Sequence, residues 1–497
     1  MARAAATKEP EFKADPDSAE PLYLQLAGHI ERSIRSGRIP LDTRLPSERL
    51  YAQQLGLSRT TVTAAYQELM ALGLVRGHVG RGTVVIADEA DAAAGGAVAW
   101  PQLASRLARA APAASQEPAP GVVSLGNGWL HPSLVPAAAL AACAAKVLQS
   151  TECVTRAAPL HGLPALRAAL AGCLRADGVK AAAEELLITG GAQQGLNVVA
   201  RSLVSPGDAV VCESPTWHGA FAAFRAAGAE VAGVAMDREG PLPAALEDAL
   251  IRLRPKFVYL IPSFQCPSGR LMSLPRRRAI LDLCARFRTP ILESHVYAEA
   301  HFGAPLPSLK SLDSAGIVIL QGSASKLLGP ALRLGWLLPP APALPLLAAT
   351  KAGLDLSTPL LNQAILARFL AEGGQTRHLP AFRRALQARR DALLAALARH
   401  CPELRCLAPQ GGIYVWAQLP RPLAAQELEA AALRHGVAVK AGDAFLPEGG
   451  ASGHIRLCYA APEAGEIETG AQRLGRALRE LLQQQRAAPV AADLAPV

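Results

Sequence analysis

The feature of this sequence that most limits its fold is a regular alternation that begins near Val122. Five short apolar runs, each suited to a buried strand, alternate with segments rich in Ala and Leu that have helical spacing. The predicted strands are 186–188, 209–212, 257–261, 290–293 and 317–320. The predicted helices are 163–175, 192–204, 219–227, 243–252 and 275–286. This alternation predicts an α/β domain in which helices cover a mostly parallel central sheet.

Each predicted strand is followed by a motif of small, polar or turn-forming residues. The motifs are 189–194 (Thr-Gly-Gly-Ala-Gln-Gln), 214–217 (Ser-Pro-Thr-Trp), 262–269 (Pro-Ser-Phe-Gln-Cys-Pro-Ser-Gly), 292–297 (Leu-Glu-Ser-His-Val-Tyr) and 322–336. Ligands of open parallel sheets bind at the carboxyl ends of the strands, so the five motifs predict one shared site. Taken singly, 189–194 is also compatible with an ordinary tight turn, and Trp217 with a core residue.

Segment 322–336 contains a lysine, Lys326, among small and apolar residues. A charged lysine is costly to bury, so it tends to lose its proton or to find a partner. A neutral lysine is a nucleophile that can form a Schiff base with an aldehyde cofactor. Ser323, Ser325 and Arg333 would then bind a phosphate, with the Arg making paired hydrogen bonds. The alternative is a lysine at the end of a strand whose amine simply reaches solvent.

A second cation lies far downstream in an apolar strand, 454–457 (His-Ile-Arg-Leu). A buried arginine needs an anionic or hydrogen-bonding partner, so Arg456 predicts a carboxylate bound at that point. The nine cysteines are scattered and include no Cys-x-x-Cys pair. We therefore predict reduced thiols and no metal site.

The N-terminal part has a different pattern, in which two short helices are separated by a glycine. Ser47 can cap the first helix, Gly56 can form the turn, and Ser58 can cap the second. Val62, Tyr66 and Leu69 would share the buried face of the second helix. The residues left exposed at its N-terminal end are Arg59, Thr60, Thr61 and Thr63. This pattern predicts a helix-turn-helix, whose second helix enters the major groove of DNA with its N-terminus first.

A predicted hairpin follows, with a tip at 76–82 that contains Gly80 and Arg81. Such a wing can bring Arg81 to a phosphate or into the minor groove. Residues 22–87 contain eight arginines and four acids, an excess of 8 − 4 = +4, which suits a polyanionic partner. A small helical domain with a solvated charged face is the alternative.

Length and composition complete the outline of a multidomain, cytoplasmic chain. At 497 residues, two or more domains are expected. The sequence shows no signal peptide and no apolar run of the roughly 20 residues that span a membrane. The predicted boundaries are a disordered 1–20, a DNA-binding domain at 21–87, a linker at 88–120 rich in Ala, Gly and Pro, an effector domain at 121–485 and a disordered tail at 486–497.

Both domains resemble known families. Residues 22–87 resemble the GntR-type winged helix-turn-helix through Pro-Leu-Tyr, Leu-Pro-Ser-Glu-Arg, Ser-Arg-Thr-Thr-Val and Gly-Arg-Gly-Thr. The strand-end motifs over about 122–485 resemble those of the fold type I aminotransferases that use pyridoxal 5′-phosphate. An α+β winged helix followed by such an α/β domain resembles the MocR subfamily of transcriptional regulators.

The resemblance implies roles for individual residues. Contacts to double-stranded operator DNA would come from Arg49, Ser58, Arg59, Thr60, Thr61, Gly80 and Arg81. Lys326 would carry the cofactor. The other cofactor-binding residues would be Gly191, Ala192, Gln193, Trp217, Cys266, Ser294, Tyr297, Ser323, Ser325 and Arg333. Arg456 would bind the carboxylate of an amine or amino-acid-like effector, and the protein would be a homodimer.

The sequence also departs from the family pattern. The family has Glu-Asp-Asp before the tyrosine, whereas this chain has Glu293-Ser294-His295. The missing Asp normally keeps the cofactor ring protonated and electron-withdrawing. Ser294 stands there, or His295 if the register is shifted by one. Cys266 replaces the common Asn before the proline. These changes predict weak or absent transaminase activity.

Three functions remain open from the sequence. The chain is a DNA-binding regulator that senses an effector through Schiff-base chemistry at Lys326; or a transaminase with an accessory DNA-binding domain; or a regulator whose pocket no longer binds the cofactor. The predictions for Ser294 and the intact phosphate motif favour the first.

Overall fold

The computed structural model describes residues 12, 14–15, 18, 20–35, 38–40, 43–78, 82–86 and 119–487. The chain divides into two compact units, Met1–Ala111 and Pro112–Val497. Most of the segments predicted as disordered ends or as linker, and the wing residues Gly80 and Arg81, lie outside the described residues.

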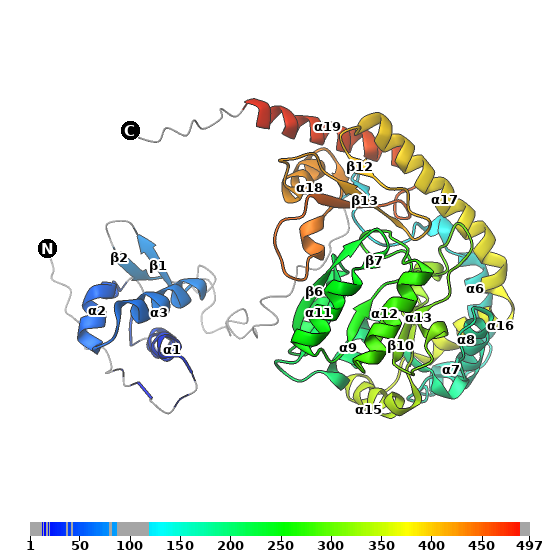
Figure 1. The fold of residues 1–497 in the computed structure, drawn as a ribbon, viewed down its shortest axis with the longest axis horizontal. Coiled ribbons are helices and arrows are strands. Elements are labelled where there is room, and N and C mark those ends of the chain that lie inside the picture. The colour runs from blue at the N-terminus through cyan, green and yellow to red at the C-terminus, as the bar shows by residue number, and fades with distance from the viewer. Residues whose placement is uncertain are drawn as a thin grey trace. The chain divides into compact units, whose positions relative to one another are not determined.

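In the first unit, the described residues form three helices and a two-stranded hairpin (Figure 1). Its elements are α1 (Leu22–Arg35), α2 (Glu48–Leu55), α3 (Arg59–Ala71), β1 (Val75–His78) and β2 (Gly82–Val85). The strands pair antiparallel, with Val75 opposite Val85 and His78 opposite Gly82. Leu26, Ile30, Val62, Tyr66 and Leu69 are among the side chains that form its core. The helix-turn-helix is thus held together by the apolar face of α3.

Local sequence explains where α2 and α3 begin and end. The Ser47 hydroxyl accepts a hydrogen bond from the Leu50 amide at the start of α2. Gly56 ends α2 with φ 65°, a left-handed conformation that favours glycine. The Ser58 hydroxyl accepts a hydrogen bond from the Thr61 amide at 3.1 Å and so caps α3. All three residues act as the sequence predicts.

The second unit contains an eight-stranded sheet in the order β4-β11-β10-β9-β8-β5-β6-β7. The strands are β4 (Leu187–Thr189), β5 (Ala209–Ser214), β6 (Glu230–Asp237), β7 (Gly240–Pro241), β8 (Val258–Leu260), β9 (Ile291–Ser294), β10 (Val318–Ser323) and β11 (Gly335–Leu338). Strands β6, β5, β8, β9 and β10 pair in parallel. Strand β11 is antiparallel to both β10 and β4. The prediction of a mostly parallel sheet is confirmed, but β6 and the antiparallel β11 were not among the predicted strands.

Helices cover both faces of this sheet because both faces are apolar. The helices that alternate with the strands are α8 (Pro164–Ala176), α9 (Ala192–Leu203), α10 (His218–Ala226), α11 (Pro243–Leu253) and α12 (Leu274–Arg286). On one face, Val211, Val258, Ile291 and Val318 pack with α11, α12 and α13 (Leu309–Leu312). On the other, Cys212, Tyr259, Leu292 and Ile319 pack with α9 and α10. Successive strand residues point to opposite faces, which gives this division.

The rest of the unit forms a smaller subdomain and the helices that join it to the sheet. Its strands are β3 (Val123–Ser124), β12 (Arg405–Cys406), β13 (Tyr414–Gln418), β14 (Val437–Ala438), β15 (Lys440–Ala441) and β16 (His454–Cys458). The remaining helices of the second unit, in the subdomain and in the connections to the sheet, are α6 (Ala137–Val147), α7 (Glu152–Thr155), α14 (Ser325–Leu328), α15 (Leu344–Leu354), α16 (Leu360–Ala371), α17 (Gly374–His400), α18 (Ala425–Arg434) and α19 (Glu466–Ala487). Strand β3 pairs with β14, so the start of this unit is fixed to its C-terminal part.

The nine cysteines are all free thiols. Within the described ranges, no group of His, Cys, Asp and Glu side chains has the arrangement of a metal site. A helix with the length and apolar character needed to cross a membrane is likewise absent from the described part of the chain.

Candidate functional site

Lys326 lies in α14, directly after β10, and its side chain is half-buried. Its amine donates a hydrogen bond to the Gly128 carbonyl at 2.8 Å and lies 4.9 Å from the centre of the Trp129 ring. Burial lowers the pKa of this amine to about 8. The neutral, nucleophilic form of the amine is therefore easier to reach near neutral pH than in an exposed lysine.

Arg456 lies in β16, and only 5% of its surface is exposed. Its Nη2 donates to the Gly126 carbonyl at 2.6 Å, and its Nη1 to the Cys266 sulfur at 3.7 Å. The guanidinium lies 4.3 Å from the centre of the Tyr414 ring. Its Nε is buried without a hydrogen-bond acceptor among the residues that the structure describes. A buried donor of this kind is usually satisfied by a ligand or by water, which fits the predicted carboxylate site.

Residues 126–129, which we call the bridging segment, contact both cations. The Gly126 carbonyl accepts from Arg456, and the Gly128 carbonyl from Lys326. A Cβ at position 128 would lie 2.2 Å from the Tyr414 hydroxyl, and one at 126 would lie 2.9 Å from the Val439 carbonyl oxygen. Both positions therefore need glycine. Sequence reasoning missed this segment, although two glycines between a short strand and Trp129 were a usable signal.

The predicted phosphate-binding residues come together at the N-terminus of α9. Gly191 precedes the helix with φ 101°, and no side chain caps the first amides. A Cβ on Gly335 would lie 2.7 Å from the Gly191 carbonyl carbon, so β11 approaches this turn closely. Arg333 donates to the Gly190 carbonyl at 3.4 Å, and the Ser323 hydroxyl accepts from the Ser325 amide at 3.2 Å. Free amides, hydroxyls and a guanidinium at a helix N-terminus form an anion site.

Gln193 and Trp217 adjoin this turn. The Gln193 amide donates to the Gly219 carbonyl at 2.9 Å, which ties α9 to the start of α10. Trp217 immediately precedes α10, and its ring lies so close to Gly219 that a Cβ there would be 2.6 Å away. The Trp217 indole is thus held beside the first turn of α9. The sequence predicted that this residue binds the cofactor.

Ser294 is the last residue of β9 and is 2% exposed. By strand alternation it shares a face with Leu292, and a hydrogen bond joins it to Tyr259. Glu293 points to the opposite face, where its carboxylate accepts hydrogen bonds from the Leu309 and Lys310 amides. Ser294 and Glu293 thus lie on opposite faces at the end of β9, and the assignment of Ser294 to the position of the missing Asp stays a prediction.

His295 lies on the Glu293 side of the strand. Its Nδ1 is 3.9 Å from the Glu293 carboxylate. Burial raises the pKa of Glu293, but the nearby His295 ring and the hydrogen bond from the Lys310 amide outweigh it and lower the pKa below its usual value. Glu293 is thus an ionised structural carboxylate that holds α13. His295 and Lys326 both line a small cavity of about 50 Å³, large enough for a few water molecules.

Cys266 and Tyr297 lie beside Arg456. Cys266 is fully buried, and burial raises the pKa of its thiol, so it stays protonated. The Tyr297 hydroxyl donates to the Tyr414 hydroxyl at 3.4 Å, and the two rings meet edge to face. Tyr414 thus contacts Tyr297 through its hydroxyl and the Arg456 guanidinium through its ring. The sequence predicted Cys266 and Tyr297 but not Tyr414, which follows a Gly-Gly pair at the start of β13.

A buried glutamate that the sequence did not single out holds the loop containing Cys266. The Glu213 carboxylate accepts hydrogen bonds from the Ile261 amide at 3.1 Å and the Gln265 side chain at 3.2 Å. Gln265 also donates to the Pro215 carbonyl at 2.7 Å. Burial raises the pKa of Glu213 to about 7. This group connects the Trp217 turn with the Cys266 loop.

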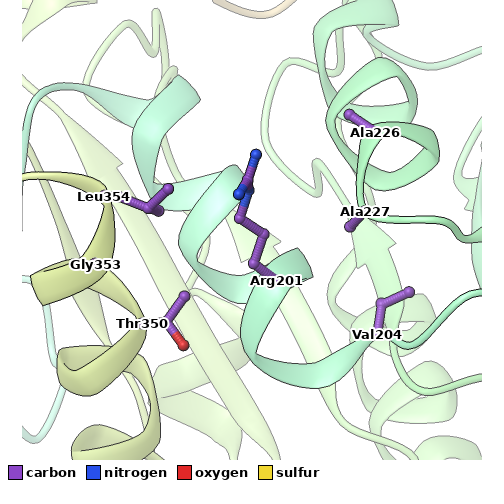
Figure 2. Close-up of a pocket in the computed structure, with 7 residues that line it drawn as sticks. All are labelled: Arg201, Val204, Ala226, Ala227, Thr350, Gly353 and Leu354. Carbon is purple, nitrogen blue, oxygen red and sulfur yellow. The ribbon is translucent and has the colours of Figure 1, made fainter. Parts of the chain in front are cut away.

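A larger hollow of about 460 Å³ lies elsewhere, at the C-terminal end of α9 (Figure 2). Figure 2 shows Arg201 in this hollow, with Thr350 and Leu354 on one side and Val204 on the other. The twelve residues of α9 place this end roughly 18 Å from the turn at Gly191. None of the predicted site residues lines it.

In the first unit, the described residues that were predicted to contact DNA lie in α2 and at the start of α3. Arg49, Arg59 and Thr60 are exposed. The Ser58 hydroxyl is 2.7 Å from the hydroxyls of Thr60 and Thr61, so it mainly orders the start of α3. Arg59 lies 3.7 Å from the Glu48 carboxylate. Thr61 and Thr63, expected to be exposed, are instead half-buried, and Thr63 donates to Glu48 at 2.9 Å.

Comparison with known proteins identifies both units. Residues 22–85 match the gntR family of bacterial regulatory proteins, and residues 121–474 match aminotransferase class I and II. The chain is 40% identical to 2-aminoadipate transaminase of Thermus thermophilus, over 73% of this chain and 91% of that protein. It is 32% identical to the probable rhizopine catabolism regulatory protein MocR of Rhizobium meliloti, over 85% of this chain and 87% of that one. The crystal structure of LysN, an α-aminoadipate aminotransferase from Thermus thermophilus, has a TM-score of 0.70 at 38% identity and covers 73% of this chain and 94% of its own.

These matches define a transcriptional regulator in which a DNA-binding winged helix precedes an aminotransferase-like domain. The chain belongs to the GntR family of regulators with an aminotransferase class I and II domain, of the MocR type. The cofactor of that domain is pyridoxal 5′-phosphate, as the sequence predicted. The site suits it: an anion-binding helix start lies near a lysine of lowered pKa, and the buried Arg456 Nε has an unused donor.

Proposed function

We propose that this protein is a cytoplasmic, homodimeric regulator that senses an amine or amino-acid-like effector at Lys326 and Arg456. The observation that carries this proposal is the bridging segment, whose two carbonyls accept hydrogen bonds from these two cations. A carboxylate makes stronger, paired hydrogen bonds with a guanidinium than a neutral carbonyl does. An effector carboxylate would therefore displace the Gly126 carbonyl from Arg456.

Pyridoxal 5′-phosphate, when bound, supplies an aldehyde that an amine can capture reversibly. Lys326 would hold the cofactor covalently, and its amine would then leave the Gly128 carbonyl. The phosphate would be bound by the α9 amides of Gly191, Ala192 and Gln193, together with Ser323, Ser325 and Arg333. Trp217, Ser294, Tyr297 and Cys266 would surround the ring.

The bridging segment also suggests how binding could reach the DNA-binding unit. It follows β3, the first strand after the residues that connect the two units. If the effector and the cofactor displaced the Gly126 and Gly128 carbonyls from Arg456 and Lys326, the bridging segment would be held less tightly. The start of the second unit would then be less firmly fixed. A coupling of about 1–3 kcal/mol between effector and operator binding is typical of allosteric proteins and would suffice.

A homodimer is consistent with operator binding and with an exposed apolar side chain of the second unit. A two-fold dimer binds a repeated or palindromic operator, since each DNA-binding unit can contact one half-site. Leu356 is a large apolar side chain that is 92% exposed in the single chain, as expected of a residue that a second copy covers. A solution mass of twice the 51.8 kDa of one chain is expected, and a monomer at working concentrations would contradict it.

The proposal includes weakened transaminase activity, which rests on Ser294. The neighbours of its hydroxyl include Tyr259, a neutral phenol whose pKa burial raises further. Both buried glutamates of the sheet are engaged elsewhere, Glu213 with Gln265 and Glu293 with α13. Among the residues that the structure describes, neither of these carboxylates is therefore available at Ser294 to stabilise a protonated ring nitrogen.

Ser294→Asp is expected to raise the single-turnover transfer of an amino group from an amino acid, on the order of 10²-fold. A carboxylate at this point would stabilise positive charge on the ring nitrogen and so the negative charge that develops during the reaction. The measurement is the rate at which the visible absorbance of the loaded protein disappears. Ser294→Asn has a similar size without the charge and is the matched control; equal rates for the two variants would rule out this account of the weak activity.

A transaminase with an accessory DNA-binding unit is the second candidate. Its support is the 40% identity to a transaminase over most of the second unit. Turnover of an amino acid and a keto acid by the unmodified chain at about 1 s⁻¹ or faster would favour it over sensing. Single-turnover transfer without sustained turnover would favour the sensor.

Arg59→Ala is expected to weaken operator binding about tenfold to a hundredfold, as for loss of an arginine that contacts a base. The guanidinium at the start of α3 is exposed, and its ion pair with Glu48 is a surface pair worth about 0.2–1 kcal/mol, so DNA can compete for it. The measurement is affinity for the operator fragment at fixed salt concentration. Arg32→Ala, on the exposed side of α1, removes the same charge and should have a much smaller effect. Equal effects would contradict the placement of the recognition helix.

A further inference from the structure

A fully buried lysine, Lys351, has no part in the function proposed above. It lies in the last turn of α15 and is 0% exposed. Its amine donates to the Asp355 carboxylate at 2.7 Å. Burying a charged amine costs free energy even when the amine is paired with a carboxylate. The position of this ion pair therefore calls for an explanation.

The second oxygen of Asp355 continues the chain of contacts. Asp355 Oδ2 accepts a hydrogen bond from the Gln194 side-chain nitrogen at 2.9 Å. The Gln194 side-chain oxygen accepts from the Gly190 amide at 2.6 Å. Both ends of the Gln194 amide are therefore used, and its orientation follows from its two partners. Three bonds lead from a buried ammonium to the backbone amide of the turn that begins α9.

This turn is the one to which the phosphate is assigned. Gly190 precedes Gly191, whose φ of 101° is maintained without a side-chain cap. Gly335 packs against it on one side, where a Cβ would lie 2.7 Å from the Gly191 carbonyl carbon. The Arg333 guanidinium lies on another, 3.2 Å from where a Cβ of Gly191 would be. The Gln194 side chain is the contact that holds the Gly190 amide itself.

We propose that Lys351, Asp355 and Gln194 are positioning residues that hold the α9 turn in the conformation that binds the cofactor phosphate. The inference rests on the proposed cofactor site. Gln194 fixes the turn through Gly190, and Asp355 fixes Gln194. Lys351 keeps the half-buried Asp355 in place and offsets its negative charge, which would otherwise repel a phosphate dianion.

The test compares pyridoxal 5′-phosphate with pyridoxal, which lacks the phosphate. Gln194→Met and Lys351→Met are expected to raise the Kd of pyridoxal 5′-phosphate about tenfold to a hundredfold, as for loss of a buried hydrogen bond or of its charge partner. The Kd of pyridoxal should change less than threefold. A purely structural role would weaken both ligands alike. Absorbance titration gives both constants, and operator affinity and thermal unfolding of the same proteins show whether they are folded.

Two further variants sharpen the result. Lys351→Met with Asp355→Asn leaves no unpaired charge and should recover part of the phosphate-dependent affinity that Lys351→Met alone loses. Ser202→Ala is the matched control, because the Ser202 hydroxyl bonds Thr350 at 2.7 Å between the same two helices without reaching Gly190. If wild type binds neither ligand, the proposed cofactor site fails. If wild type prefers pyridoxal 5′-phosphate and the variants keep that preference unchanged, the site stands and the positioning role is overturned.

Discussion

Replacing Lys326 by alanine is expected to abolish covalent attachment of pyridoxal 5′-phosphate and with it the visible absorbance band of the purified protein. Lys326 is the amine that adjoins the predicted phosphate turn, and burial lowers its pKa to about 8. Alanine removes the nucleophile altogether, so the loss should be complete. The measurements are the absorbance spectrum and the mass of the protein after borohydride reduction, which makes the attachment permanent.

Two controls separate chemistry from folding. Lys326→Arg keeps a cation for the Gly128 carbonyl but cannot capture an aldehyde, so it should also lack the band. Lys310→Ala removes another lysine near the sheet, whose amine donates to the Val318 carbonyl, and should keep the band. A lowered pKa means that the neutral amine accumulates as pH rises toward about 8, so cofactor uptake should accelerate up to that pH and level off above it. A borohydride mass increase in Lys326→Ala would contradict the assignment.

Arg456→Lys is expected to weaken binding of a carboxylate-bearing effector about tenfold to a hundredfold, as for loss of one hydrogen bond to a charged group. Lysine keeps the charge, but it cannot make two parallel hydrogen bonds to a carboxylate. The guanidinium also stacks on Tyr414 and Phe445, at 4.3 and 4.8 Å from their ring centres, and this fixes its plane. The measurement is a spectral titration of the loaded protein with the tightest-binding amino acid from a panel.

The same titration with the amine that lacks the carboxylate provides the comparison. Its affinity should change little, because it makes no contact that needs Arg456. Arg389→Lys is the matched control for altering a buried arginine: Arg389 is 7% exposed and binds the Ser133 hydroxyl and backbone carbonyls instead. Equal losses for amino acid and amine would assign Arg456 a structural role.

Capping residues and apolar runs predicted much of the fold, because the effect of each depends on only a few neighbouring residues. Ser47, Gly56 and Ser58 begin and end helices as predicted, since a cap needs only its own turn. Strands β6 and β11 were missed for different reasons. Residues 230–237 are half-exposed and not continuously apolar. Residues 335–338 follow the Lys326 motif so closely that they read as part of it, and their antiparallel pairing with β10 and β4 is a long-range property.

By itself, the sequence determined the class of protein, the cofactor and the order of the strand-end motifs, because each motif is a contiguous run with its own turn chemistry. It also predicted roles for Lys326, Ser294 and Arg456. The tertiary structure decided which atoms meet. Lys326 and Gly128 are 198 residues apart, Arg456 and Gly126 are 330 apart, and Gln194 and Asp355 are 161 apart. The sequence contains each of these residues but no local pattern that pairs them. Only packing of the sheet against its helices and the smaller subdomain brings them within hydrogen-bond distance, and so defines the bridging segment and the support of the phosphate turn.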